Sequence, residues 1–170
     1  MRELADAQQI RRFMEALGPA AVVEGDCYLT GGATAVLLGW RATTVDVDIA
    51  LEPEQDAVLR VIPRLKNELS INVELASPGD FIPLPPGWRD RSAFVERVGK
   101  LSFRHFDPVS QALAKLERSH AQDLEDVRTM LERRLVDAAQ LRDAFATIEP
   151  ELYRYPALDP GDFRRSVEEL

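Results

Sequence analysis

The amino-acid sequence predicts an α+β fold, in which a small β-sheet is flanked by helices and followed by a helical C-terminal segment. Two observations carry this prediction. Short segments in which apolar and polar residues alternate, as they do in strands, occur between residues 27 and 106. From residue 108 onward, apolar residues recur with the helical period instead. We therefore expect a core at residues 1–107 and a helical region at residues 108–170, packed together as a single compact unit.

Each element follows from a local pattern. Strands are expected where apolar and polar residues alternate, and helices where apolar residues recur every three or four positions. Glycine and proline mark the ends of both kinds of element. In chain order, we expect a helix at 4–17, strands at 20–23 and 27–30, a helix at 31–38, a strand at 45–51, a helix at 53–69, a strand at 71–75, a hairpin of strands at 94–98 and 101–106, and helices at 108–118, 121–134 and 137–148, with a last short helix near the C-terminus.

Prolines set three further expectations. Pro53 suits the first turn of a helix, because its fixed φ angle and missing N–H cost nothing there. Pro63 lies inside the same helix and should kink or divide it. Four prolines between Ser77 and Trp88 predict a rigid, extended loop.

The composition is that of an ordinary globular protein. Hydrophobic residues make up 45% and charged residues 29% of the 170 residues, which is enough for a sizeable core. The single cysteine, Cys27, rules out an internal disulfide, and no apolar run is long enough to cross a membrane. We therefore expect a cytoplasmic protein without a membrane partner. The formal net charge of −8 argues against nonspecific coating of nucleic acid.

A glycine pair stands shortly before two aspartates. Gly31-Gly32 opens a helix whose first N–H groups have no partner within the helix, an arrangement that favours phosphate binding. Asp46 and Asp48 occupy alternate positions of the next strand, so they point to the same face and can hold a divalent cation. A phosphate site followed by metal-binding carboxylates within about twenty residues is what nucleotidyl transfer requires.

The strand that carries the two aspartates also predicts its own orientation. Val45, Val47 and Ile49 occupy the other set of alternate positions. We expect these three side chains to face the core, and the carboxylates to face away from it.

A third carboxylate from a neighbouring strand would complete the metal site. Glu74 lies between Val73 and Leu75, so it should point away from the core as the two aspartates do. There it could also accept the proton of an attacking hydroxyl. Asp26 and Asp80 are alternatives, on loops whose direction the sequence leaves open. An ordinary solvent-facing strand position is the other interpretation of Glu74.

Three motifs carry a family resemblance. They are Gly31-Gly32-Ala33-Thr34-Ala35, the segment from Arg41 to Asp48, and Ala112–Arg118 together with Asp123–Val127. In these segments the chain resembles the polymerase-beta-like nucleotidyltransferase superfamily, and more narrowly the small bacterial nucleotidyltransferases grouped with the AbiEii/AbiGii toxins. The resemblance implies a minimal nucleotidyltransferase fold with a mixed sheet. It also implies Mg²⁺, in a two-metal site, and a nucleoside triphosphate (NTP) as the donor substrate.

The resemblance implies roles for single residues. Lys115 would reach a phosphate, and Asp123 or Asp126 would orient it or activate the acceptor. Many superfamily members have a serine directly after the first glycine, whereas this chain has Gly32 there and a threonine, Thr34, two residues on. The complete expected site consists of catalytic Asp46, Asp48, Glu74 and Lys115, of which the first three are also metal ligands, and of nucleotide-binding Gly31, Gly32, Thr34, Arg41, Thr44, Lys115, Asp123 and Asp126.

We therefore predict an enzyme that moves a nucleoside monophosphate from an NTP to an acceptor hydroxyl on a tRNA, a protein or a small molecule. The resemblance also implies a toxin–antitoxin or phage-defence role, with a cognate antitoxin as partner. The alternative is a catalytically silent nucleotide-binding or antitoxin-like module of the same fold, which Gly32 in place of serine and the acidic composition favour. A metal-dependent phosphohydrolase is a weaker alternative, because His105 and His120 stand apart and form no metal-ligand cluster.

Overall fold

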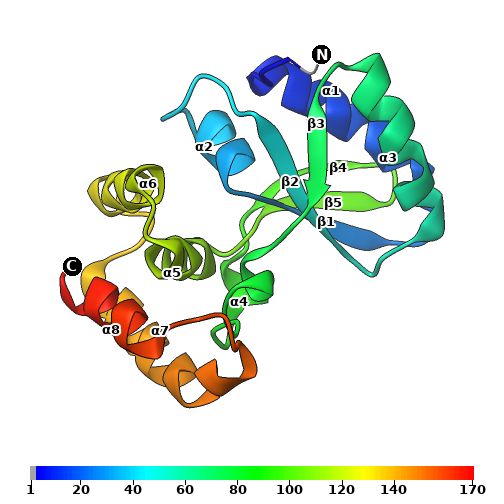
Figure 1. Cartoon of the computed structure of the whole chain (residues 1–170). Helices are drawn as coiled ribbons and strands as arrows, with labels where there is room; N and C mark the ends of the chain where they lie inside the picture. The colour runs from blue at the N-terminus through cyan, green and yellow to red at the C-terminus, as the bar shows by residue number, and fades with distance from the viewer. Residues whose placement is uncertain (1–2) are drawn as a thin grey trace. The chain divides into compact units, whose positions relative to one another are not determined.

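The computed structural model describes residues 3–170, and the chain divides into two compact units (Figure 1). The first unit comprises the residues up to 77 together with 93–105, and the second comprises residues 78–92 together with 106–170. Residues 78–92 thus belong with the C-terminal helices, although they precede the last two strands in the sequence.

The first unit contains a five-stranded mixed sheet with the strand order β3-β2-β1-β5-β4, and this confirms the predicted fold class (Figure 1). β1 runs antiparallel to β2 and parallel to β5, β2 runs parallel to β3, and β4 runs antiparallel to β5. The elements of this unit are α1 (Ala7–Leu17), a 3-10 turn η1 (Gly18–Ala20), β1 (Gly25–Thr30), α2 (Gly32–Leu38), β2 (Asp46–Glu52), α3 (Asp56–Glu68), β3 (Asn72–Leu75), β4 (Phe94–Val98) and β5 (Leu101–His105).

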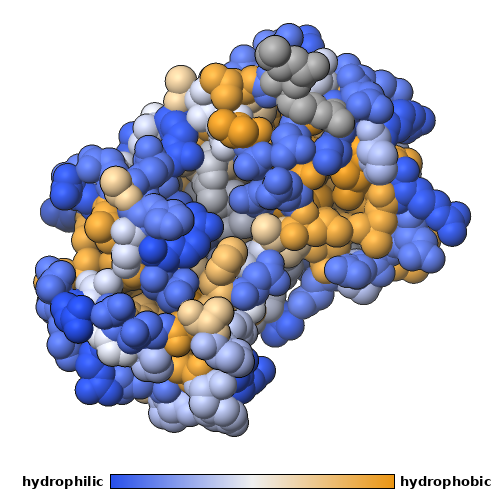
Figure 2. Space-filling model, in the orientation of Figure 1, coloured by the Kyte–Doolittle hydropathy of each residue, from blue (hydrophilic) through white to orange (hydrophobic). Residues whose placement is uncertain are grey.

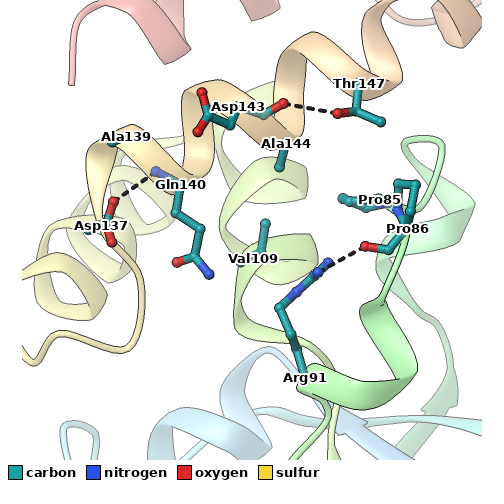
Figure 3. Close-up of a pocket in the computed structure, with 10 residues that line it drawn as sticks. All are labelled: Pro85, Pro86, Arg91, Val109, Asp137, Ala139, Gln140, Asp143, Ala144 and Thr147. Atoms are coloured by element: carbon teal, nitrogen blue, oxygen red, sulfur yellow. Dashed lines mark hydrogen bonds between the residues drawn. The ribbon is translucent and has the colours of Figure 1, made fainter.

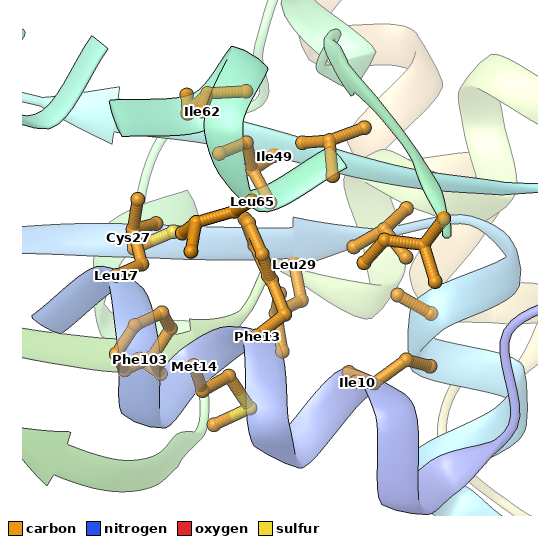
Figure 4. Close-up of a cluster of buried hydrophobic side chains, with 14 of the residues drawn as sticks. Ile10, Phe13, Met14, Leu17, Cys27, Leu29, Ile49, Ile62, Leu65 and Phe103 are labelled. Atoms are coloured by element: carbon orange, nitrogen blue, oxygen red, sulfur yellow. The ribbon is translucent and has the colours of Figure 1, made fainter. Parts of the chain in front are cut away.

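The hydrophobic core of the first unit lies between the sheet and the helices α1 and α3 (Figure 4). α1 begins after Asp6, whose side chain accepts a hydrogen bond from the backbone of Gln9 at 2.9 Å and caps the helix. The apolar side of α1 is fully buried, as the helical spacing predicted. In Figure 4 the buried side chains of α1 face side chains from β1, β2, β5 and α3. The cluster includes Ile10, Phe13, Met14 and Leu17 of α1, together with Cys27, Leu29, Ile49, Ile62, Leu65 and Phe103.

The prediction of a strand at residues 20–23 is wrong. The backbone turns through η1 after α1, and Val22 and Val23 are 62% and 50% exposed. Their N–H groups donate to the side-chain oxygen of Gln55 at 3.0 and 3.2 Å, and the amide of Gln55 donates back to the carbonyl of Val23. A side-chain amide from far along the sequence therefore takes the place of a strand partner.

Two predictions around β2 also need correction. Val45 does not face the core but is 65% exposed, because the strand begins one residue later and Thr44 pairs with Ala5 through two backbone hydrogen bonds. The helix that follows β2 begins at Asp56 rather than at Pro53. The buried Gln55 occupies its N-cap position, and the Gln55 side chain binds residues 22 and 23 instead of capping the helix.

α3 continues through Pro63, so the proline does not divide the helix. Pro63 instead lines an apolar groove of about 460 Å³ between α3 and the edge strand β3. Figure 2 shows a hydrophobic patch over these two elements, in the area where Figure 1 places β3 and α3. The groove is lined by Leu59, Ile62, Pro63, Lys66, Asn67, Val73 and Leu75.

The second unit is helical, as the sequence predicted for the C-terminal part. The loop at 77–88 is not extended throughout, since it forms a 3-10 turn whose Gly79 carbonyl accepts a hydrogen bond from the Tyr155 hydroxyl at 2.8 Å. Within residues 3–170, no helix is long and apolar enough to span a membrane. The elements are η2 (Pro78–Asp80), α4 (Trp88–Arg91), α5 (Pro108–Arg118), α6 (Ala121–Glu132), α7 (Ala138–Ile148), η3 (Glu149–Arg154) and α8 (Pro160–Glu168).

A buried carboxylate fastens α4 to the start of α5. Asp107 is 0% exposed and caps α5 by accepting hydrogen bonds from the backbone of Val109 and Ser110 at 3.0 and 3.2 Å. Arg91 binds the same carboxylate through two nitrogens, at 2.9 and 2.8 Å. Such a two-point pair compensates the buried charge and fixes the orientation of both groups.

Candidate functional site

The glycine pair forms a sharp corner between β1 and α2. Gly31 has φ 61° and ψ −128°, a conformation that requires glycine, and it precedes the first residue of α2, Gly32. α2 has seven residues and ends at Gly39, which has φ 93°. The predicted short helix between two glycine turns is confirmed.

Asp46 and Asp48 lie on one face of β2, beside this corner. Both are half-buried and alternate with the buried Val47 and Ile49, so the carboxylates and the core side chains occupy opposite faces of the sheet. Asp48 pairs with Thr30 of β1, the residue directly before Gly31. A Cβ atom placed on Gly31 would lie 3.4 Å from Oδ2 of Asp48. The structure therefore brings the glycine corner and the aspartates together, although they are apart in the sequence.

β3 extends this face with two further polar side chains. In the parallel pairing of β2 and β3, Asn72 lies beside Asp46 and Glu74 lies beside Asp48. The side-chain amide of Asn72 donates to Oδ1 of Asp46 at 2.5 Å and to Oε1 of Glu74 at 3.2 Å. We call the group of Asp46, Asp48, Asn72 and Glu74 the acidic face. The sequence predicted three of its members and missed Asn72, whose signal is its position two residues before Glu74 on the same strand.

The acidic face offers the oxygen ligands that Mg²⁺ prefers. Oδ1 of Asp48 is buried and accepts no hydrogen bond from the described residues, although the residue makes a further interaction. Glu74 is exposed, and it turns toward Asn72. Within residues 3–170, no three His, Cys, Asp or Glu side chains are arranged to hold a metal ion. The donor chemistry thus fits a divalent cation, and binding would require Glu74 to move toward the aspartates if it serves as the third ligand.

Arg41 and Thr44 lie against the glycine corner. A Cβ atom on Gly32 would come within 2.0 Å of Oγ1 of Thr44 and within 3.2 Å of a guanidinium nitrogen of Arg41. The Thr44 hydroxyl donates to the backbone carbonyl of Asp46 at 3.0 Å. Residue 32 is therefore glycine because the Thr44 side chain occupies the space that any other side chain would need.

Thr34 points into the fold and contacts a histidine that the sequence analysis left without a role. Its hydroxyl donates to the carbonyl of Leu29 at 3.2 Å and lies 3.1 Å from Nδ1 of His105. Burial lowers the pKa of His105 to about 4, so the ring is neutral at physiological pH. Which of the two groups donates in this contact depends on the tautomer of the neutral ring. Alternation with the buried Leu101 and Phe103 on β5 was the signal that placed His105 inside.

Lys115, Asp123 and Asp126 lie together in the second unit, on α5 and α6. Nζ of Lys115 is 2.8 Å from Asp126 and 3.9 Å from Asp123, and all three side chains are nearly buried. Arg118 binds Asp123 at 2.6 Å. We call Lys115, Arg118, Asp123 and Asp126 the lysine cluster. The predicted closeness of the two aspartates to a cation is present, and Arg118 is an additional member.

The two alternative third carboxylates belong to other elements. Asp26 sits on β1, pairs with Glu52 in the sheet register, and binds Arg104 at 2.9 Å. Asp80 belongs to η2 in the second unit. Glu74 is the candidate that the register of β2 and β3 sets beside Asp48.

A separate pocket lies in the second unit and contains none of the predicted site residues. Its volume is about 520 Å³. In Figure 3, Gln140, Asp143 and Thr147 of α7 form one wall, and Pro85, Pro86 and Arg91 form another. Arg91 donates to the carbonyl of Pro86 and binds Asp107, so its guanidinium is already engaged in the structure.

Comparison with known proteins gives one match. Residues 7–158 match the model of a family described as "Nucleotidyltransferase of unknown function (DUF6036)". No curated protein and no solved structure matches the chain. Resemblance to the AbiEii group in particular thus stays a prediction.

Proposed function

We propose that this chain, which belongs to that nucleotidyltransferase family, transfers a nucleoside monophosphate from an NTP to an acceptor hydroxyl. The observation that carries the proposal is the position of Asp48, with Oδ2 3.4 Å from the Cβ position of Gly31 and Asp46 on the same face of β2. Phosphate-binding backbone and metal-binding carboxylates would then act at one place.

The triphosphate would lie against the N–H groups of Gly31 and Gly32, with the Arg41 guanidinium beside them as the positive charge. Asp46, Asp48 and Glu74 would hold Mg²⁺. When bound, the metal supplies positive charge that stabilises the phosphate oxygens during an in-line displacement. Thr34 and Thr44 pack behind this corner, where both would support the backbone that binds phosphate.

In the proposed reaction, the acceptor oxygen forms a bond to the α-phosphorus of the NTP. The bond from that phosphorus to the bridging oxygen breaks, and pyrophosphate leaves with the electron pair. Glu74 would accept the proton of the acceptor hydroxyl, since it is exposed at the edge of the acidic face and can meet an incoming substrate.

Lys115 keeps its proposed role as a catalytic, phosphate-binding cation. Asp126 would orient its ammonium group, since the two groups are 2.8 Å apart, and Asp123 would fix Arg118 next to it. The proposed acceptor is a hydroxyl of a tRNA, a protein or a small molecule. The proposed setting is a toxin–antitoxin or phage-defence pair with a cognate antitoxin.

The test is transfer of label from each α-³²P-labelled NTP, with Mg²⁺, to total tRNA, to a protein extract or to a small-molecule pool. Asp48→Asn should lower transfer by about 10³-fold, because it removes charge that balances the metal. Glu54→Gln, an exposed acid on the turn before α3, is the matched control and should leave transfer unchanged. NTP binding without transfer to any acceptor would identify the silent module instead.

A further inference from the structure

The two carboxylates at the outer edge of the acidic face share one neutral partner. Asn72 donates one hydrogen bond across the sheet to Asp46, at 2.5 Å, and a second along its own strand to Glu74, at 3.2 Å. A primary amide carries two N–H protons, so both can be used in this arrangement. The amide nitrogen rather than the amide oxygen must point toward the two carboxylates, because an amide oxygen has no hydrogen to donate and would be repelled by them.

The first bond fixes how Asp46 presents its oxygens. Oδ1 is directed toward Asn72 on β3, so Oδ2 is the oxygen left to face other groups. Asp48 lies two residues along β2 on the same face. A carboxylate that could rotate freely would have to be ordered by the cation itself, and this ordering would weaken binding.

The second bond fixes Glu74 at the rim. Glutamate is long and exposed here, and its side chain would otherwise sample several rotamers. Asn72 holds Oε1 of Glu74 on the same amide nitrogen that holds Asp46. The amide of Asn72 therefore places a hydrogen-bond donor between the carboxylates of Asp46 and Glu74. Because the amide is neutral, it adds no positive charge that would compete with a metal ion.

We propose that Asn72 is a positioning residue of the metal site: through its amide it orients Asp46 and so sets the affinity for a divalent cation, while it holds Glu74 at the rim of the acidic face. This inference rests on the proposed function, in which these carboxylates hold Mg²⁺. Outer partners of metal ligands change metal affinity by about ten- to a hundred-fold when they are removed.

The composition of the chain allows a direct test, because Asn67 and Asn72 are its two asparagines. Selective ¹⁵N-asparagine labelling of the full chain gives two side-chain NH₂ signals, and Asn67→Ala assigns them. Without metal, Asp46→Ala should move the Asn72 signal strongly, and Glu74→Ala should move it less, since the second bond is longer. The Asn67 signal should not move in either variant. An Asn72 signal that is unchanged in both variants would overturn the proposal.

The second measurement uses Mn²⁺ as the probe, with free Mn²⁺ counted by electron paramagnetic resonance. Asn72→Ala should weaken Mn²⁺ binding about tenfold, and Asn67→Ala should not change it. Asn72→Val, which keeps a strand-forming side chain, repeats the test if the alanine variant folds poorly. Wild-type affinity in both Asn72 variants would refute the positioning role. Wild-type protein that binds no Mn²⁺ would refute the proposed metal site, and the metal-free NMR signals would still decide whether Asn72 holds the two carboxylates.

Discussion

Carboxylates gather in two regions of this chain, the acidic face in the first unit and the lysine cluster in the second, and the two regions hold them differently. In the lysine cluster, Asp126 lies 2.8 Å from Lys115 and Asp123 lies 2.6 Å from Arg118. On the acidic face, Asp46 and Glu74 are held by the amide of Asn72. A neutral donor orients a carboxylate without cancelling its charge. The carboxylates of the lysine cluster are therefore balanced by cations, whereas Asn72 adds no positive charge to Asp46 and Glu74.

The largest effect expected from this comparison comes from Lys115→Met. The substitution leaves the buried Asp126 without its cation, so the free energy of unfolding should fall by about 3–5 kcal/mol. Chemical denaturation measures the change. Arg128→Met is the matched control, because Arg128 and Glu125 form an exposed pair on α6 and their loss should cost well under about 1 kcal/mol. Equal costs for the two variants would mean that the lysine cluster is not held by its buried pair.

A buried histidine, His105, makes the stability of the first unit sensitive to acid pH. His105 has a folded-state pKa of about 4, below its ordinary value of 6.5, because burial disfavours the charged ring. Between pH 6.5 and 4 the unfolded chain therefore binds a proton that the folded chain does not, and stability falls as pH falls. The expected loss attributable to this group is about 3 kcal/mol across the window.

His105→Asn should remove this part of the pH dependence, because an amide does not titrate. The asparagine can still form a hydrogen bond with Thr34, so the contact is kept. Urea unfolding at a series of pH values between 7 and 4 measures it. His120 is exposed, so His120→Asn should keep the wild-type slope. A wild-type slope in the His105 variant would show that other groups cause the acid sensitivity.

A smaller effect is expected within the lysine cluster itself. Arg118 is partly exposed. When it is removed, Asp123 still has the ammonium group of Lys115 as a neighbouring cation, at 3.9 Å. Arg118→Gln should therefore cost about 1 kcal/mol in the free energy of unfolding. A cost as large as that of Lys115→Met would place the stabilising charge of the cluster on Arg118 instead.

The smallest effect is expected on the acidic face without metal. Asp46→Asn removes one of several like charges, so stability should change by no more than about 0.5 kcal/mol. Added Mg²⁺ should raise the melting temperature of the wild type but not that of this variant, because a ligand of the folded state stabilises it. Differential scanning fluorimetry at increasing Mg²⁺ gives both results. An equal Mg²⁺ response in both proteins would place the cation elsewhere.

The sequence predicted the features that depend on neighbours along the chain. Alternation placed Asp46, Asp48 and Glu74 on the outer face of their strands, and glycine positions marked both ends of α2. The positions of the long helices followed from apolar spacing. Whether these residues act in nucleotide transfer stays a prediction.

The features that were missed depend on residues far apart in the sequence. Gln55 satisfies the backbone of Val22 and Val23, so a segment that resembles a strand pairs with a side chain instead. Asn72 could be recognised as part of the site only from its strand register with Asp46. His105 could be recognised only from its contact with Thr34. Local patterns carry no information about such pairings.

The register of β3 against β2 has a consequence for how this protein can diverge. Side chains on a strand alternate between faces, so the alignment that sets Asn72 and Glu74 beside the aspartates also buries Val73 with Val47 and Ile49. A slip of one residue in β3 would push two polar side chains inward and expel Val73. An insertion or deletion that caused such a slip would be eliminated by selection for folding alone. The arrangement of the acidic face would then be inherited together with the hydrophobic core.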